Sequence, residues 1–266
     1  MRYLWVVLQK RPGGKVMKEI KVRNQILGQG PPKICIPLMG KDLAELLAAT
    51  GIAVEANADM YEFRADFLEA AADEERVEEA LNGIRSLIGD SPLIFTLRSE
   101  REGGKKTLSL DKYISLNQKV VGTGLADILD VELDRGEEAV KHLLSASHQK
   151  GVFVLLSNHN FEGTPPKEEI ISILCRMQQL GADITKLAVM ARSEKDVLVL
   201  LEATLAMRER YGDRPFITVS MGQKGIISRV AGGLFGSAVT YASGNDPSAP
   251  GQLQASSVRY VLNLLY

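Results

Sequence analysis

Short apolar runs alternate with longer amphipathic segments along most of the chain. The apolar runs are rich in β-branched residues and stand between polar turns, which is typical of buried strands. The segments between them repeat apolar residues every three or four positions, as helices with one buried face do. The predicted strands cover residues 34–38, 58–66, 92–98, 126–133, 152–156, 181–189, 216–220 and 237–242. The predicted helices cover residues 41–53, 73–88, 110–121, 136–149, 165–180, 193–210, 226–234 and 253–264.

Eight strand–helix units in succession predict a parallel α/β sheet. Eight units in about 240 residues is the size of a closed (β/α)₈ TIM barrel, so we expect this fold class. The alternative is an open doubly wound sheet, which normally carries a glycine-rich phosphate loop after its first strand. Here residues 34–38 lead into Met-Gly-Lys-Asp at 39–42, without such a loop. Alternating residues over 19–27 predict a short N-terminal β-hairpin that closes the bottom of the barrel.

Residues 1–16 precede this pattern and differ from it. Their apolar run ends at Leu8, is shorter than the core of a signal peptide, and is followed by Lys10, Arg11 and Pro12 rather than by a small-residue cleavage site. We predict an extension over residues 1–16 and a single (β/α)₈ barrel domain over residues 17–266.

Composition and charge exclude several classes of partner. The chain has 266 residues, with 32 Lys and Arg against 33 Asp and Glu and a formal net charge of -1. This balance gives no general attraction to nucleic acid or anionic membranes, so neither is expected as a partner. No apolar run approaches the ~20 residues of a membrane-spanning helix. The two cysteines, Cys35 and Cys175, have no CxxC spacing, which disfavours a thiolate metal site and fits a cytoplasmic protein.

One lysine lies in the middle of an otherwise apolar predicted strand. Lys186 stands between Thr185 and Leu187 in the run over 181–189. Burying an ammonium group without a partner is costly, and the usual escape is to keep the lysine as a neutral amine. A desolvated neutral amine is the nucleophile of Schiff-base chemistry. The structural alternative is a lysine at a strand end whose amine reaches solvent.

Charged side chains also mark the ends of most other predicted strands. In a barrel, reactive groups lie at the C-terminal ends of the strands and in the loops that follow. Residues spaced by two share one face of a strand, so the charges at 62, 64 and 66 and those at 130, 132 and 134 are expected on two such faces. The charged positions are Glu62, Arg64, Asp66, Arg98, Asp130, Glu132, Asp134, His159 and Arg229.

Several of these residues also have a purely structural interpretation. Glu62 and Arg64 could form an ion pair that helps to close the barrel. His159 could cap a helix or stabilise a loop. For Asp130 and Glu132 we favour support of the neighbouring charges over a chemical role.

The occurrence of all these residues in one predicted site favours a catalytic role over separate structural roles. A cavity that holds Lys186, His159, arginines and carboxylates is costly unless it is used. It supplies a nucleophilic amine, a proton-transfer group and guanidinium groups for an anion. The residues thus predict a Schiff-base lyase or an aldolase that acts on a small anionic keto compound. The loop over 243–252 is a candidate lid.

Six motifs occur in a fixed order from about residue 17 to the C-terminus. They are Glu62-Phe-Arg64-Ala-Asp66-Phe, Phe95-Thr-Leu-Arg98-Ser-Glu-Arg-Glu102-Gly-Gly, Ser157-Asn-His159-Asn-Phe-Glu-Gly-Thr-Pro, Asp183-Ile-Thr-Lys186-Leu-Ala, Ile227-Ser-Arg229 and Ser248-Ala-Pro-Gly-Gln252. Together they resemble the motifs of type I 3-dehydroquinate dehydratase. The resemblance implies a (β/α)₈ barrel, a homodimer, and no metal or organic cofactor. It also implies conversion of 3-dehydroquinate to 3-dehydroshikimate and water, the third step of the shikimate pathway, used in biosynthesis or in quinate breakdown.

The resemblance further implies a role for each site residue. Lys186 would form an imine with the C3 ketone of the substrate. His159 would remove the C2 proton and protonate the departing C1 hydroxyl, a syn elimination, and Glu102 would orient and tune His159. The implied substrate-binding residues are Glu62, Arg64 and Arg98 for the ring and its hydroxyls, and Arg229, Ser248 and Gln252 for the carboxylate.

Two positions depart from the family pattern. Pro37 stands where some members carry a serine that contacts the substrate, so one hydrogen bond is expected to be missing. Asn160 follows the histidine where aspartate is common, and little effect is expected. Two other interpretations remain. A class I aldolase would not need the clamp of Arg229 and residues 248–252, and a non-catalytic barrel would not need the reactive residues.

Overall fold

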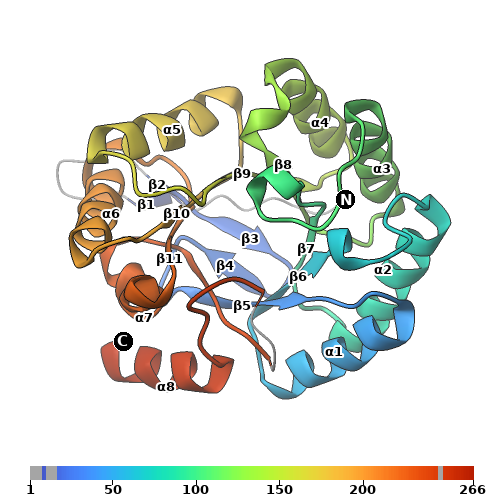
Figure 1. Ribbon diagram of the computed structural model, residues 1–266, viewed down its shortest axis with the longest axis horizontal. Helices are drawn as coiled ribbons and strands as arrows, with labels where there is room; N and C mark the ends of the chain where they lie inside the picture. Colours follow the sequence, from blue (N-terminus) through green and yellow to red (C-terminus); the bar gives the residue numbers. More distant parts are fainter. Residues whose placement is uncertain (1–7, 10–16, 245–247) are drawn as a thin grey trace.

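The computed structural model describes residues 8–9, 17–244 and 248–266. Within them, eight parallel strands form a barrel and eight α-helices surround it (Figure 1). The barrel strands are β5 (Lys33–Leu38), β6 (Met60–Arg64), β7 (Leu93–Thr96), β8 (Ile128–Glu132), β9 (Phe153–Asn160), β10 (Ile184–Met190), β11 (Phe216–Met221) and β12 (Val239–Tyr241). The helices are α1 (Leu43–Glu55), α2 (Glu74–Ile88), α3 (Leu110–Thr123), α4 (Glu137–Gln149), α5 (Lys167–Leu180), α6 (Glu194–Ala206), α7 (Ile226–Phe235) and α8 (Ala255–Leu265).

The first and last strands of the barrel pair with each other. β12 runs parallel to β5, with Tyr241 opposite Cys35, and the neighbouring pairs from β5 to β11 are parallel as well. Next to β11, the amide of Ala238 donates to the carbonyl of Phe216 at 2.8 Å and brings β12 alongside. In a doubly wound sheet the first and last strands would not be neighbours in this circular order. The predicted (β/α)₈ barrel is therefore confirmed.

Side-chain caps explain where several helices begin. The capping residues of α1, α2, α3 and α6 are Asp42, Asp73, Ser109 and Ser193, whose side chains accept from first-turn backbone amides. α6 ends before the predicted limit of residue 210. A π-helical turn, Met207–Tyr211, follows Ala206, and the amide of Gly212 closes it on the carbonyl of Met207.

No helix in the described part of the chain is long and apolar enough to cross a membrane.

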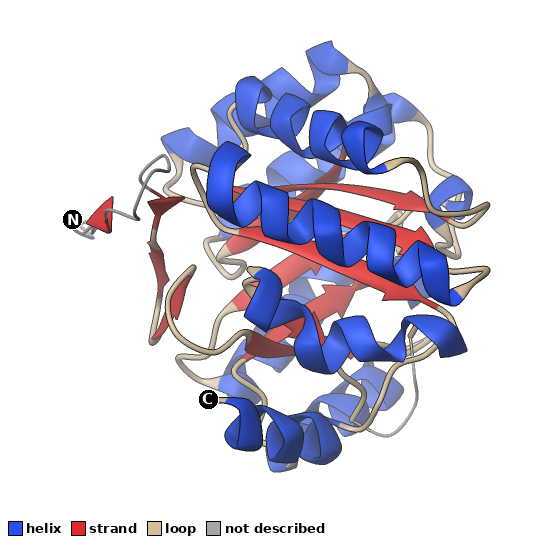
Figure 2. Cartoon of the chain, turned by 90° about the vertical axis from the view of Figure 1, so that its left-hand side faces the viewer, coloured by secondary structure: helices blue, strands red, loops and turns tan. Residues whose placement is uncertain are grey.

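An antiparallel hairpin lies at the end of the barrel where its strands begin (Figure 2). It consists of β3 (Ile20–Val22) and β4 (Gln25–Leu27). Ile20, Val22 and Leu27 are buried in the same cluster as the lowest apolar side chains inside the barrel. Removing this apolar surface from water stabilises the closed end. The hairpin predicted at the bottom of the barrel is thus confirmed.

A second antiparallel pair precedes this hairpin. β1 (Leu8–Gln9) pairs with β2 (Met17–Lys18). The amide of Lys18 donates to the carbonyl of Asp213 at 2.7 Å, which ties the pair to the loop before β11. The rest of the predicted extension, residues 1–7 and 10–16, lies outside the described residues.

The side chains inside the barrel change character along the strands. Near the hairpin they form an apolar cluster that includes Met60, Ile94, Ile128, Leu155 and Ile184. Two residues further along the same strands the buried side chains are Glu62, Thr96, Asp130, Ser157 and Lys186. Because parallel strands all finish at the same end of the barrel, this polar layer lies toward the C-terminal ends, where barrel active sites form.

Strand ends correct three sequence-based expectations. β9 continues to Asn160 although the predicted strand stops at 156, because its polar end pairs with β10, with Ala188 opposite His159. Pairing with a neighbouring strand has overridden the turn-like sequence. Asp66 and Asp134 do not continue the charged faces of their strands, since each lies in a 3₁₀ turn after its strand ends.

Candidate active site

A pocket opens at the C-terminal ends of the barrel strands. The residues that line it and that were predicted from the sequence are Glu62, Arg64, Arg98, Glu102, His159, Lys186, Arg229, Ser248 and Gln252. The structure thus brings every predicted site residue to one place. It adds Phe161, Met221 and Tyr241, which sequence reasoning did not single out.

Lys186 projects from β10 into this pocket and is 5% exposed. Its Nζ atom lies 3.0 Å from Tyr241 Oη and 3.4 Å from Glu62 Oε1. A second carboxylate oxygen, Asp130 Oδ2, is 3.9 Å away. These three groups are polar partners of the buried amine, so Lys186 is not the strand-end lysine, with its amine in solvent, of the structural alternative. The amine must give up a proton before it can act as a nucleophile.

Glu62 is the closest carboxylate to the lysine amine. Burial disfavours its charged form, but Lys186, Arg64 and Arg98 outweigh burial and lower the pKa of Glu62. Thr96 also donates to Glu62 Oε1 at 2.9 Å. Arg64 pairs instead with Asp66, through two hydrogen bonds of 2.8 Å each. The ion pair between Glu62 and Arg64 that the structural interpretation expected is not the one that forms.

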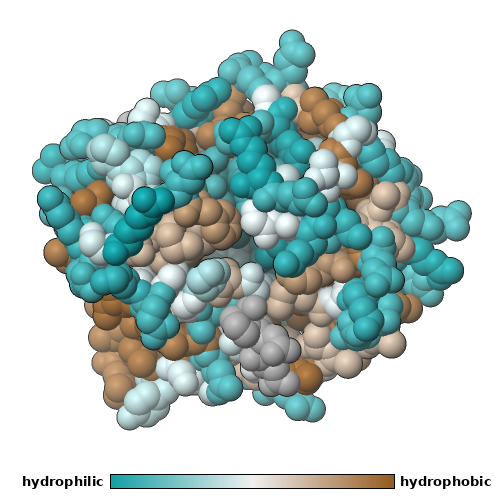
Figure 3. All heavy atoms as spheres, in the orientation of Figure 1, coloured by the Kyte–Doolittle hydropathy of each residue, from teal (hydrophilic) through white to brown (hydrophobic). Residues whose placement is uncertain are grey.

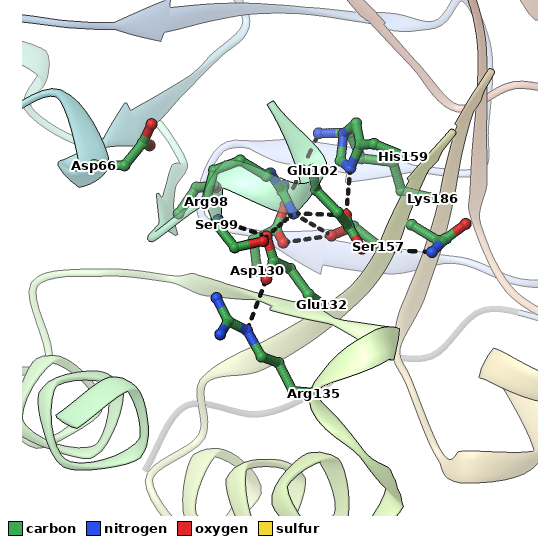
Figure 4. Close-up of polar contacts among 12 residues, drawn as sticks. Asp66, Arg98, Ser99, Glu102, Asp130, Glu132, Arg135, Ser157, His159 and Lys186 are labelled. Atoms are coloured by element: carbon green, nitrogen blue, oxygen red, sulfur yellow. Dashed lines mark hydrogen bonds and ion pairs between the residues drawn. The ribbon is translucent and has the colours of Figure 1, made fainter. Parts of the chain in front are cut away.

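His159, which is partly buried, pairs with the buried Glu102 beside the lysine (Figure 4). Nδ1 of His159 lies 2.8 Å from Oε2 of Glu102. Burial and the nearby cations Arg98, Lys186 and Arg64 lower the pKa of His159 well below its ordinary value. The imidazole is therefore neutral and can accept a proton. Burial and neighbouring carboxylates raise the pKa of Glu102 to about 8, although Arg98 acts against this rise.

Arg98 is the centre of a buried polar network under the histidine (Figure 4). Its guanidinium donates to Asp130 at 2.7 Å, Ser157 at 2.9 Å and Glu132 at 3.2 Å, and lies 3.4 Å from Glu102. Burial alone would lower the pKa of Arg98, but these carboxylates raise it well above its ordinary value. The network holds Asp130 and Glu132 as counter-charges, the supporting role that we favoured for them.

Arg229 has a different environment from the other arginines of the site. It lies on α7, is 2% exposed, and donates to the carbonyls of Tyr241 at 3.3 Å and Pro250 at 3.0 Å. Its Nε has no hydrogen-bond partner among the described residues. Burial lowers the pKa of Arg229 to about 10. A buried, incompletely satisfied guanidinium favours binding of an anion, above all a carboxylate that matches its fork.

The loop before α8 brings two more polar side chains to the pocket. Ser248 and Gln252 bond each other, with the Ser248 amide 2.7 Å from Gln252 Oε1 and Gln252 Nε2 2.9 Å from Ser248 Oγ. Gly251 lets this loop cross the end of β11, because it has a φ of +78° and an added Cβ would lie 2.3 Å from the carbonyl oxygen of Gly222. The candidate lid is thus fastened next to Arg229.

The two departures from the family pattern have clear positions. Pro37 lies in β5 opposite Glu62. The Asn160 side chain accepts from the amides of Glu162 and Gly163 and shapes the turn after β9. An aspartate could accept the same bonds, so this position fits the expectation of little effect.

The polar pocket has the residues for one class of chemistry. A lysine amine, a neutral imidazole and a guanidinium anion site face one cavity at the C-terminal end of a (β/α)₈ barrel. These groups define a lyase that acts through a Schiff base on an anionic carbonyl compound. No cluster of three or more His, Cys, Asp or Glu side chains in the described ranges is arranged to hold a metal ion.

Comparison with known proteins identifies the family. A family model described as type I 3-dehydroquinase matches residues 34–266. The 3-dehydroquinate dehydratase of Bacillus licheniformis is 51% identical over 249 residues, which cover 94% of this chain and 98% of that protein. A crystal structure of type I 3-dehydroquinate dehydratase from Clostridium difficile has a TM-score of 0.90 at 47% identity, covering 94% of this chain and 98% of that chain. The 3-dehydroquinate dehydratase structure from Geobacillus kaustophilus also has a TM-score of 0.90, at 43% identity, with 93% and 96% covered.

The chain belongs to the type I 3-dehydroquinase family. This family comprises lyases that dehydrate 3-dehydroquinate in the shikimate pathway through a lysine Schiff base. The identities and the matching fold confirm the family resemblance predicted from the six motifs.

Proposed function

We propose that the protein removes water from 3-dehydroquinate by syn elimination, with Lys186, His159 and Glu102 as the catalytic residues. The observation that carries this proposal is the joint position of a lysine amine, a neutral imidazole and an incompletely satisfied guanidinium in one pocket. The amine supplies the covalent step, the imidazole moves the proton, and the guanidinium recognises a carboxylate.

The proposed reaction begins at the lysine amine. After losing a proton, Nζ of Lys186 attacks the C3 carbonyl carbon and forms a carbinolamine, which loses water to give a protonated imine. The imine withdraws electrons and acidifies the adjacent C2–H bond. Nε2 of His159 takes the C2 proton. The same imidazole then protonates the C1 hydroxyl as it leaves as water, and hydrolysis of the product imine restores the amine. The net change is loss of one water molecule.

The proposed binding residues divide between the two sides of the ring. Arg229, with Ser248 and Gln252, would bind the carboxylate, because the arginine has an unused Nε donor and the loop adds neutral polar groups beside it. Glu62 and Arg64 would contact the ring hydroxyls, since both line the pocket. Arg98 also lines it, but most of its donors bond protein groups, so we propose that it positions Glu102 as well as binding substrate.

An absorbance assay tests this function against its rivals. Addition of 3-dehydroquinate is expected to produce the absorbance of the conjugated enone in 3-dehydroshikimate. A phosphorylated sugar, the substrate type of many aldolases, is expected to give no cleavage, because the proposed anion site is built for a carboxylate. A protein that binds 3-dehydroquinate without producing the enone would support the non-catalytic alternative.

We further propose that the enzyme is a cytoplasmic homodimer. Apolar side chains gather over α7 and α8, at the lower left of Figure 3. They include Leu234 at 42% exposed and Leu264 at 69% exposed, and a second copy of this chain would cover them. Light scattering is expected to give the mass of a dimer and, for Leu264→Glu, a shift toward monomer.

The proposed cytoplasmic location fits the two cysteines, which are thiols, as expected for a reducing compartment. Cell fractionation tests that location.

A further inference from the structure

Tyr241 contacts the lysine amine more closely than either nearby carboxylate does. It lies on β12 and is 5% exposed. Nζ of Lys186 donates to Tyr241 Oη at 3.0 Å and lies 4.1 Å from the centre of the tyrosine ring. The carboxylate oxygens of Glu62 and Asp130 are 3.4 Å and 3.9 Å from Nζ. The tyrosine is therefore the nearest polar partner of the proposed nucleophile.

A buried thiol lies next to the tyrosine and can accept its proton. Cys35 lies opposite Tyr241 on β5 and is fully buried, and its sulfur is an available acceptor for the phenol proton. A phenol has one proton and a lone-pair side. When the proton points toward the sulfur of Cys35, the lone pair faces Nζ of Lys186. Burial, with Glu62 and the Cys35 thiol, raises the pKa of Tyr241 well above its ordinary value, so the phenol keeps its proton.

The backbone of Tyr241 reaches the other end of the proposed substrate site. Its carbonyl oxygen accepts a hydrogen bond from Nη1 of Arg229 at 3.3 Å. One residue thus contacts both the amine that would attack the ketone and the guanidinium that would hold the carboxylate. The ring of 3-dehydroquinate fixes the separation of its ketone and carboxylate, so the protein must fix the separation of their partners to match.

We propose that Tyr241 is a positioning residue for imine formation, whose hydroxyl directs the lone pair of the Lys186 amine toward the substrate ketone. A neutral amine has two N–H bonds and one lone pair. If one N–H remains bonded to Tyr241 Oη and the second to Glu62 Oε1, rotation about the Cε–Nζ bond is restricted and the lone pair points away from both acceptors. The inference rests on the imine-forming role of Lys186 under the proposed function.

The test compares Tyr241→Phe with a matched control, Tyr61→Phe. Both changes remove one hydroxyl from a buried tyrosine and keep the ring. Tyr61 belongs to the cluster packed between strands and helices, outside the pocket. The measurement is the rate at which 3-dehydroquinate forms a borohydride-trapped adduct in a single turnover, followed by intact mass, together with kcat, KM and melting temperature.

For Tyr241→Phe we expect trapping to slow by about tenfold, the effect of losing roughly one buried hydrogen bond between neutral groups. kcat should fall in parallel while KM changes by less than about twofold, because the carboxylate site is intact. Tyr61→Phe should trap at the wild-type rate. A wild-type trapping rate for Tyr241→Phe would overturn the inference, as would equal slowing in the two variants.

A second variant covers the case in which Tyr241→Phe does not fold. Cys35→Ala leaves the phenol in place but removes the acceptor of its proton, and is expected to slow trapping by about threefold. Trapping at the wild-type rate in Cys35→Ala would then overturn the inference. A wild-type protein that turns over 3-dehydroquinate without an adduct on Lys186 would contradict the proposed function instead.

Discussion

Glu102 and His159 lie 2.8 Å apart and form a hydrogen-bonded pair that lines the pocket. When Glu102 is ionised, it accepts the Nδ1 proton of His159 and leaves Nε2 as the proton acceptor. When Glu102 is protonated, it donates to Nδ1 and the imidazole proton lies on Nε2. Nε2 can then no longer accept a proton from the substrate. Under the proposed mechanism, the protonation state of the carboxyl therefore decides whether the imidazole can remove a substrate proton.

This pair predicts how activity depends on pH. The pKa of Glu102 is raised to about 8, so the carboxyl is protonated below this pH and ionised above it. kcat/KM for 3-dehydroquinate, which reports the free enzyme, should rise with pH and level off above about 8. In Glu102→Gln the side-chain oxygen can accept from Nδ1 at every pH, so this step should vanish. Persistence of the step in Glu102→Gln would assign it to another group.

The buried guanidinium of Arg229 predicts opposite effects on stability and activity. Arg229→Met removes an incompletely satisfied buried cation, so the free energy of unfolding should rise by about 1–2 kcal/mol. kcat/KM should fall by more than about 100-fold, because the carboxylate loses its charged partner.

Arg85→Met is the control for this prediction. Arg85 is also largely buried, but it pairs with Asp127 at 2.8 Å, so its loss should destabilise the fold by about 3 kcal/mol. Denaturant unfolding measures both values. An Arg229→Met protein that is destabilised as much as Arg85→Met would contradict the view that Arg229 is an incompletely satisfied cation.

The lid geometry predicts a defect in substrate binding for Gly251→Ala. The substitution places a Cβ against the carbonyl oxygen of Gly222 in a residue with a φ of +78°, so the loop must move away from β11. KM should rise by about tenfold or more, because Ser248 and Gln252 leave the carboxylate site. Gly30→Ala is the control, since Gly30 has a φ of +67° and open space around it. Equal changes in KM for the two variants would refute a specific role of the lid.

The N-terminal extension is predicted to be dispensable. Deleting residues 1–16 removes β1 but keeps the hairpin of β3 and β4, which supplies the buried side chains at the bottom of the barrel. The truncated chain should keep the wild-type kcat and lose less than about 1 kcal/mol of unfolding free energy. A large loss of stability would show that the extension covers part of the barrel.

The fold was predictable because the hydrophobic period within each segment indicates a strand or a helix, and the order of the segments indicates the topology. The alternation of strand and helix patterns predicted the barrel, and alternation over 19–27 predicted the hairpin. Strand ends were less predictable. Residues 157–160 are polar and turn-like on their own, and only pairing with β10 makes them part of β9. A pattern within one segment does not carry information about its neighbour in space.

The members of the site were also predictable, but their contacts were not. Lys186 was conspicuous because a charge interrupts an apolar strand, whereas Tyr241 sits in a strand where an aromatic residue is ordinary. Its contact with Lys186 joins residues 55 positions apart in sequence. The pairing of Arg64 with Asp66 rather than Glu62 likewise depends on a 3₁₀ turn that redirects the Asp66 side chain.

In the proposed reaction, Lys186 forms the covalent intermediate and His159 moves the proton. The measurement is a peptide mass spectrum after 3-dehydroquinate and borohydride have been added to the wild type, Lys186→Ala and His159→Ala. We predict one reduced adduct on the peptide that contains Lys186 in the wild type, none in Lys186→Ala, and an adduct with very slow turnover in His159→Ala. An adduct that survives in Lys186→Ala, or an active wild type with no adduct at Lys186, would contradict the account.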